Sequence, residues 1–151
     1  MNAMLTAAEK MALSMGALFE SSGYQLYQMS KFEEYDLYAK NKDFLVSDSV
    51  ITFTDTNGKL MALKPDVTLS IVKNGKDLPW VQKVYYNENV YRDYREIMQA
   101  GLECVGDLGS YEIAEVVLLA AQSLSRLSEN YVPGDAAGQN LRQRRGLHPF
   151  R

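Results

Sequence analysis

Apolar residues recur every three or four positions between residues 6 and 22, which is the spacing of a helix with one buried face. That face comprises Met11, Met15, Leu18 and Phe19. Thr6 and Glu9 have the spacing of a capping box, and Gly23 is a typical residue to end a helix. The pattern therefore predicts a helix over residues 6–22, followed by a short strand over residues 24–29.

The next segment, residues 30–45, is charged and aromatic without a clean period, so we expect a loop or an irregular helix there. Residues 50–55 and 59–64 then form two strand-like runs that flank Asn57-Gly58. Both residues of that pair tolerate positive φ, which predicts a hairpin.

A second helix is predicted directly after the hairpin. Pro65 ends the second strand, and Asp66 is a suitable N-cap for a helix that runs to about Asn74. The inward-facing residues of this helix would be Val67, Ile71 and Val72.

Strands dominate the segment from residue 80 to residue 106. Residues 80–86 predict a strand, Asn87-Glu88-Asn89 a turn, and residues 90–92 its partner. In the long strand that follows, alternate residues share a face. One face carries Ile97, Gln99, Gly101, Glu103 and Val105. The other face carries Met98, Ala100, Leu102 and Cys104, is apolar, and is expected to lie against a core.

The last predicted helix begins at Gly109 and Ser110. Its broad apolar stripe comprises Ile113, Val116, Val117, Ala120, Leu124 and Leu127. Hairpins and consecutive strands between helices predict an α+β fold, with an antiparallel sheet flanked by helices. We expect this core over residues 1–132. Residues 133–151 lose all periodicity and predict an irregular or disordered basic tail, for which a nucleic-acid-binding arm is the alternative.

Composition narrows the possible chemistry. The chain has 151 residues, 46% hydrophobic and 23% charged, as is ordinary for one globular domain. A net charge of −3 argues against a broad nucleic-acid surface. Cys104 and His148 are the sole residues of their kinds, so an internal disulfide, a structural zinc site and a Ser-His-Asp site in the domain body are excluded. We find no signal peptide or membrane-spanning stretch, and expect a cytoplasmic protein without a bound metal or cofactor.

Gln99 and Glu103 are the most informative positions. They place an amide and a carboxylate on one face of a strand, with Gly101 between them to let a ligand approach the backbone. Such groups suit a small cation, for example the ammonium of an amino acid. The alternative is the solvated outer face of an antiparallel sheet.

Three segments resemble the histidyl branch of the class II aminoacyl-tRNA synthetases. YRDYREIMQAGLECVG at residues 91–106 resembles motif 2, and LMALKPDVT at residues 60–68 resembles the branch's "laLRPd.T" signature. GYQLYQMSKFE at residues 23–33 is similar to the motif 1 region. The segments occur in the family's order, and the resemblance covers residues 5–132. It implies an antiparallel sheet flanked by helices.

The resemblance also implies a histidine-binding pocket. Gln99 and Glu103 match positions that contact histidine in histidyl-tRNA synthetases, and Asp66 and Thr68 match residues that line the amino-acid pocket. A helix cap and a ligand site are compatible roles for Asp66, because helix N-termini often bind ligands. Lys64 stands where the family usually has arginine.

Arg92 matches the motif 2 arginine, which in active synthetases touches the α-phosphate and the amino-acid carboxylate. A guanidinium fork suits either oxyanion. The alternative is a surface arginine paired with Glu88 or Glu96. The loop after it, which in active enzymes clamps ATP and the acceptor end of tRNA, shrinks here to Asp93-Tyr94. Nothing resembles motif 3, with its second ATP-binding arginine.

These departures favour the synthetase-like family of regulatory subunits of ATP phosphoribosyltransferase, the first enzyme of histidine biosynthesis. The resemblance implies no catalytic residues, assembly with the catalytic subunit, and feedback inhibition by L-histidine. The expected assembly is a homodimer or a hetero-oligomer, with no membrane or nucleic-acid partner. The alternatives are a divergent or truncated histidyl-tRNA synthetase and a dimerisation module without a ligand.

Overall fold

The computed structural model describes residues 5–45, 50–75 and 80–128. The predicted tail over residues 133–151 lies outside these ranges. Helices and strands are mixed along the chain, which confirms the α+β fold class. In chain order the elements are α1 (Ala7–Ser21), β1 (Gln25–Leu26), β2 (Phe32–Glu34), α2 (Tyr35–Ala39), η1 (Lys42–Phe44), β3 (Thr52–Thr54), β4 (Leu60–Leu63), α3 (Thr68–Gly75), β5 (Gln82–Arg92), β6 (Arg95–Val105) and α4 (Ser110–Leu127).

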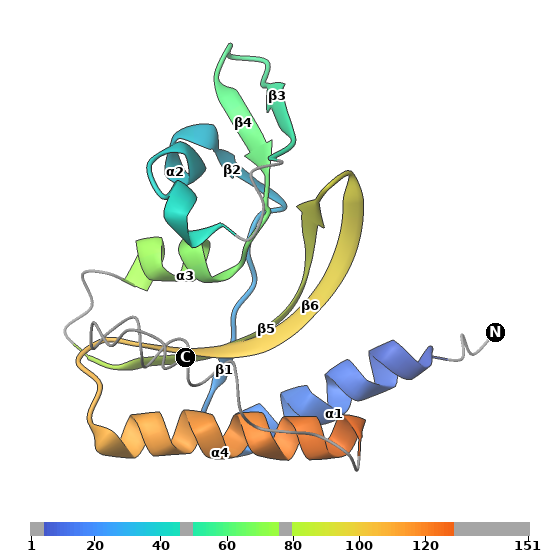
Figure 1. Cartoon of the computed structure of the whole chain (residues 1–151), viewed down its shortest axis with the longest axis vertical. Coiled ribbons are helices and arrows are strands. Elements are labelled where there is room, and N and C mark those ends of the chain that lie inside the picture. Colours follow the sequence, from blue (N-terminus) through green and yellow to red (C-terminus); the bar gives the residue numbers. More distant parts are fainter. Residues whose placement is uncertain (1–4, 46–49, 76–79, 129–151) are drawn as a thin grey trace, which may run out of the picture.

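The described strands form two small sheets (Figure 1). The first has the order β1-β5-β6, in which β5 and β6 are antiparallel and β1 runs parallel to β5. The second has the order β2-β4-β3 and is antiparallel throughout. The expected antiparallel sheet is therefore divided in two and includes one parallel pair.

Both faces of the long β5–β6 ribbon are covered. Helices α1 and α4 lie along one face, and α3 lies on the other (Figure 1). The core on the α1–α4 side comprises Phe19, Tyr24, Tyr85 and Leu119, with Leu102 packed against it. The core on the α3 side comprises Val67, Ile71, Val84, Tyr86 and Val90. The apolar face predicted for β6 thus meets a core at Leu102, whereas Met98, nearer the turn, is exposed.

Helix α1 is defined by local signals in the sequence. The Thr6 backbone N–H donates to Glu9 Oε2 at 2.7 Å, and the Glu9 N–H donates to Thr6 Oγ1 at 3.2 Å, so the predicted capping box is confirmed. Gly23 follows the helix with φ of +84°, a conformation that glycine adopts without steric cost. The strand expected over residues 24–29 is limited to β1.

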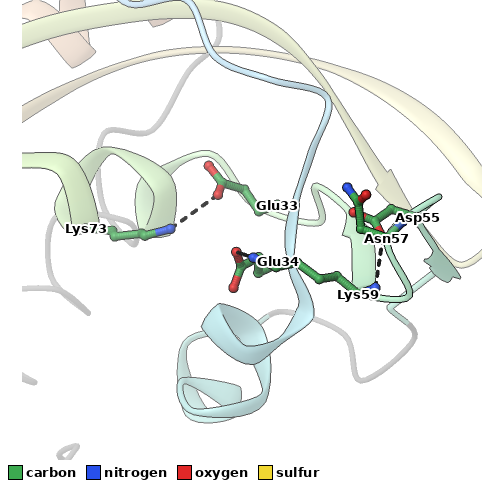
Figure 2. A network of polar contacts seen from close by, with 6 residues as sticks. All are labelled: Glu33, Glu34, Asp55, Asn57, Lys59 and Lys73. Atoms are coloured by element: carbon green, nitrogen blue, oxygen red, sulfur yellow. Dashed lines mark hydrogen bonds and ion pairs between the residues drawn. The ribbon is translucent and has the colours of Figure 1, made fainter.

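The segment expected to be a loop or an irregular helix contains β2, α2 and η1. Two ion pairs connect this segment to its surroundings (Figure 2). Lys73 Nζ of α3 lies 3.4 Å from Glu33 Oε2, and Lys59 Nζ lies 2.8 Å from Glu34 Oε1. Strand β2 is thereby joined both to α3 and to the hairpin of β3 and β4.

The hairpin predicted at Asn57-Gly58 is confirmed by β3 and β4, but its turn differs from the expected one. Within the turn only Gly58 has positive φ, at +80°. Asp55 Oδ1 accepts from the N–H groups of Asn57 and Lys59, each at 2.8 Å. The side chain of Asp55 therefore stabilises a wider turn that ends in a left-handed glycine.

The prediction of a turn at Asn87-Glu88-Asn89 was wrong. Strand β5 runs through these residues without a break and pairs with β6 along its whole length. The polar side chains find partners within the fold: Glu88 pairs with Lys64, and Asn89 Nδ2 donates to Glu96 Oε1 at 2.7 Å. The actual turn is Asp93-Tyr94, where φ is +50° and +61°.

One expectation about a buried face was also wrong. Val72 of α3 is exposed, although Val67 and Ile71 are buried as predicted. In α4 the apolar stripe of Ile113, Val117, Leu124 and Leu127 is exposed, and the buried residues are Leu119 and Ser123. Glu115 also lies on the side of α4 that faces the ribbon, where its Oε2 forms an ion pair with Lys83 Nζ at 2.6 Å.

Candidate functional site

Strand β6 presents Gln99 and Glu103 on the same face, as alternation along the strand predicted. Their cross-strand partners on β5 are Glu88 and Val84. Because Val84 belongs to the core beneath α3, this face looks toward the N-terminal end of α3. The predicted amide and carboxylate therefore share one side of the ribbon with the other predicted residues.

The start of α3 brings Asp66 and Thr68 to this face. Asp66 Oδ1 accepts from the Leu69 N–H at 3.0 Å, which is the expected N-cap contact. Thr68 Oγ1 donates to Glu103 Oε1 at 2.6 Å, across 35 positions of sequence. Val67 and Ile71 anchor the helix in the core below. Packing of α3 thus places a carboxylate and a hydroxyl directly beside Glu103.

Glu103 is electrostatically unusual. Burial raises the pKa of its carboxyl above the usual value of 4.5, the Thr68 hydrogen bond opposes that rise, and the charge of Asp66 adds to it. The charge of Asp66 thus disfavours the ionised form of Glu103. A cation placed between Asp66 and Glu103 would relieve this repulsion.

Gln99 and Arg92 each carry a buried polar atom without a hydrogen-bond partner. These atoms are Gln99 Oε1 and Arg92 Nε. Buried polar atoms in folded proteins are nearly always satisfied, so each such atom calls for an explanation, such as a ligand. Two of the predicted site residues therefore offer an acceptor and a donor that the described part of the chain leaves unused.

The alternative role for Arg92, an ion pair with Glu88 or Glu96, is absent among residues 5–45, 50–75 and 80–128. Glu88 pairs with Lys64, and Glu96 Oε1 accepts from Asn89 and Tyr91. Arg92 lies beside Arg95 in the register of the ribbon, next to the turn. The guanidinium therefore remains available on the face that also carries Gln99.

Tyr86 is a member of this site that the sequence analysis missed. It lies opposite Gly101 in the register, and a Cβ at position 101 would stand 2.6 Å from Tyr86 Oη. The gap at Gly101 is thus filled by a tyrosine, which corrects the expectation that it admits a ligand to the backbone. Burial raises the pKa of Tyr86, with further contributions from Glu103 and Asp66, while Thr68 and Arg92 act in the opposite direction. A phenol therefore lies within electrostatic reach of all four residues.

Lys64 and Glu88 were also missed as a pair. Lys64 Nζ lies 3.0 Å from Glu88 Oε2, and the lysine side chain is 0% exposed. Lys64 was noted for its place in the signature segment, but its partner lies 24 residues away and could be found only from the fold. The available signal was an acidic residue on the strand face that also carries Val84, Tyr86 and Val90.

The opposite face of the ribbon holds a different set of polar groups. Tyr24 Oη donates to Glu115 Oε2 at 3.2 Å, beside the Lys83–Glu115 ion pair. Burial raises the pKa of the Cys104 thiol there, in agreement with its predicted place on a core face. A cavity of about 470 Å³ also opens on this side between α1 and β5, lined in part by Gly16, Glu20 and Tyr85. The candidate site does not include this cavity.

Two kinds of feature are absent from the described residues. No group of three or more His, Cys, Asp or Glu side chains in residues 5–45, 50–75 and 80–128 is arranged to hold a metal ion. Over the same ranges, no helix has the length and apolar character needed to cross a bilayer.

Curated relatives carry two kinds of name. An ATP phosphoribosyltransferase regulatory subunit of Ruminiclostridium cellulolyticum is 27% identical, with 70% of this chain and 28% of the relative covered. A histidine–tRNA ligase of Methanococcus aeolicus is 28% identical, with 76% of this chain and 30% of the relative covered. The chain therefore spans only about 30% of the length of these relatives.

Solved structures give the same fold. A protein of Bacillus halodurans described as an ATP phosphoribosyltransferase regulatory subunit/histidyl-tRNA synthetase has a TM-score of 0.67 at 25% identity, with 83% of this chain and 36% of that chain covered. Histidyl-tRNA synthetase from S. aureus also has a TM-score of 0.67, at 21% identity, with 83% of this chain and 33% of that chain covered. The family model described as histidyl-tRNA synthetase matches residues 2–132. The chain therefore belongs to the histidyl-tRNA synthetase family, with the fold of a class II synthetase core.

Proposed function

We propose that this chain is part of a non-catalytic regulatory subunit of ATP phosphoribosyltransferase in histidine biosynthesis, and that its synthetase-like site binds L-histidine. The proposed site comprises Asp66, Thr68, Arg92, Gln99 and Glu103. The observation that carries the proposal is the 2.6 Å hydrogen bond from Thr68 to Glu103, which brings the start of α3 onto the face of β6 that carries Gln99. The relatives named as regulatory subunits support the assignment.

The side chains of the site suit the groups of a free amino acid. The carboxylates of Asp66 and Glu103 favour an ammonium, and charge-assisted hydrogen bonds of this kind are the stronger ones. Gln99 Oε1 is an unused acceptor for the ammonium or for an imidazole N–H. The guanidinium of Arg92 suits the ligand carboxylate. A bound histidine would therefore satisfy groups that the described chain leaves unsatisfied.

The turn between β5 and β6 supports the absence of catalysis. Only Asp93 and Tyr94 separate the two strands. The resemblance implies that active enzymes of the family have a longer loop at this place, which clamps ATP and the acceptor end of tRNA. A tight turn has too few residues to enclose a nucleotide.

A histidine-binding subunit without catalysis must act through a partner, for which the catalytic subunit of ATP phosphoribosyltransferase is the proposed protein. The proposed assembly is a homodimer or a hetero-oligomer in the cytoplasm. Histidine would shift this assembly only through different affinities for its two arrangements. Residues 1–132 form the binding core in this proposal.

Calorimetric titration with L-histidine tests the site. We expect Glu103→Gln to weaken the affinity at least about tenfold, since a charge-assisted contact to the ligand is lost. Glu96→Gln is the matched control, because Glu96 lies on the opposite face of the same strand. Equal affinity of the wild type and Glu103→Gln would remove Glu103 from the site, and no binding by the wild type would contradict the proposal itself.

The second candidate is a divergent or truncated histidyl-tRNA synthetase, which the relatives named histidine–tRNA ligase favour. Histidine-dependent exchange of pyrophosphate with ATP distinguishes the two functions. We expect no exchange above background. A third possibility, a dimerisation module without a ligand, predicts a dimer in light scattering together with no heat of histidine binding.

A further inference from the structure

Lys64 and Glu88 form the most deeply buried ion pair among the described residues. Their charged atoms are 3.0 Å apart, and the side chains of Lys64 and Glu88 are 0% and 18% exposed. The ion pair between Lys59 and Glu34 is similar in length, at 2.8 Å, but its side chains are 61% and 58% exposed. The chain thus contains a buried pair and a matched exposed pair.

The buried pair connects the two segments that form the candidate site. Lys64 precedes Asp66 by two residues and directly follows β4, in the short link that leads to α3. Glu88 lies directly opposite Gln99 in the ribbon. One side of the ion pair therefore belongs to the segment that carries Asp66 and Thr68, and the other side belongs to the surface that carries Gln99 and Glu103.

The backbone of Lys64 is held from two directions as well. Its N–H donates to Lys31 O at 3.0 Å, and its carbonyl accepts from the Tyr91 N–H at 2.8 Å. These contacts place Lys64 between the residue that precedes β2 and the C-terminal end of β5. The side chain then has a single charged partner in the described chain, which is Glu88.

A buried ion pair is a weak source of stability compared with an apolar pair, because both charges lose their hydration. Breaking the pair is costly, since an unpaired charge then remains buried. A pair of this kind therefore favours one arrangement of the segments that carry it. An exposed pair, by contrast, contributes little.

We propose that Lys64, through its ion pair with Glu88, is a positioning residue that holds the start of α3 against β5–β6, so that Asp66 and Thr68 face Gln99 and Glu103. This inference rests on the proposed histidine site for its ligand readout. Its geometric content, the ordered start of α3, does not depend on histidine.

The test compares Lys64→Met, Lys64→Arg and the control Lys59→Met in the full chain, with two readouts. The first is the exchange rate of the Leu69 amide, which donates to Asp66, relative to the Gly101 amide, which pairs with Tyr86 in the centre of the ribbon. The second is the affinity for L-histidine. We expect Lys64→Met to accelerate Leu69 exchange at least about tenfold more than Gly101 exchange and to weaken histidine binding about tenfold or more.

Lys64→Arg, which keeps the charge, should restore both readouts, and Lys59→Met should change neither. Equal acceleration at Leu69 and Gly101 would show a general loss of stability and overturn the inference. If Lys64→Met fails to fold, Glu88→Gln removes the partner charge at nearly constant volume and should selectively accelerate Leu69 exchange. If Glu88→Gln leaves Leu69 unchanged, the inference is wrong. A wild type that binds no histidine contradicts the proposed function, and the Leu69 readout still decides the inference.

Discussion

Gly101 leaves the space that the hydroxyl end of Tyr86 occupies on the site face of the ribbon. A Cβ at position 101 would come within 2.6 Å of Oη and 2.8 Å of Cζ of that ring. These atoms belong to a ring that is itself 5% exposed and surrounded by the core beneath α3. The close approach therefore cannot be relieved by a small rotation into solvent.

We expect Gly101→Ala to lower the free energy of unfolding by about 1–3 kcal/mol, the usual cost of overpacking. Urea denaturation measures this change. A Tyr86→Leu background supplies the control, because the shorter side chain frees the space and the same substitution should then cost much less. Equal costs in both backgrounds would rule out the contact with Tyr86 as the cause.

The shifted pKa of Glu103 should make the stability of the fold depend on pH. Its pKa is raised in the folded protein, first by burial, from a usual value of 4.5. The folded state thus holds the proton more tightly than the unfolded chain, so the contribution of Glu103 to stability is largest below the unfolded pKa and falls as the pH rises through the folded pKa. The neutral glutamine of Glu103→Gln lacks this dependence.

We therefore expect the stability of the wild type relative to Glu103→Gln to decrease as the pH rises from 4.5, the usual pKa of a glutamate, toward neutral pH. Chemical denaturation of the two proteins at several pH values provides the measurement. A constant difference across this range would mean that the carboxyl titrates alike in the folded and unfolded states.

At the scale of elements, the β5–β6 ribbon has an unusual turn. Asp93 and Tyr94 adopt φ of +50° and +61°, as hairpin turns of two residues require, but neither is a glycine. A left-handed conformation costs a residue with a Cβ roughly 1–2 kcal/mol. The Tyr94 side chain, 90% exposed, recovers little of this by packing.

Tyr94→Gly should accordingly raise the free energy of unfolding by about 1 kcal/mol, because glycine adopts positive φ freely. Thermal or urea denaturation would register the gain. Tyr94→Ala removes the same ring and keeps the Cβ, so it should give no comparable gain. If both variants stabilise equally, the exposed ring and not the backbone is responsible.

The elements that could be predicted from the sequence are those with local causes. Helix α1 depends on Thr6 and Glu9, three positions apart, and the β3–β4 hairpin depends on its short turn. The run Asn87-Glu88-Asn89 resembles a turn in sequence because its partners Lys64 and Glu96 are contributed by other segments of the chain. A local pattern cannot contain such partners.

The same distinction explains what was found and missed in the candidate site. The shared face of Gln99 and Glu103 follows from alternation in one strand, and the N-cap role of Asp66 follows from its neighbours. The place of Tyr86 opposite Gly101 depends on the register between two strands. Because a break was wrongly predicted in β5, the pairing of Tyr86 with Gly101 could not be deduced.

At the scale of the whole molecule, the ribbon separates two layers. One layer contains α1 and α4, and the other contains α3 and the second sheet (Figure 1). The candidate site lies between the ribbon and the second layer. The Glu33–Lys73 and Glu34–Lys59 pairs, which join β2 to its neighbours, belong to that second layer (Figure 2). An exposed apolar stripe on α4 belongs to the first layer.

Two adjacent residues in the middle of β5, Tyr85 and Tyr86, face the two different layers. Tyr85 points toward α1, where its hydroxyl donates to Glu20 Oε1, and Tyr86 points toward Gly101 and the site. Both residues are almost fully buried in close-packed surroundings. If an occupant of the site shifted the backbone at Tyr86, the adjoining Tyr85 on the far side of the sheet would therefore have to move as well.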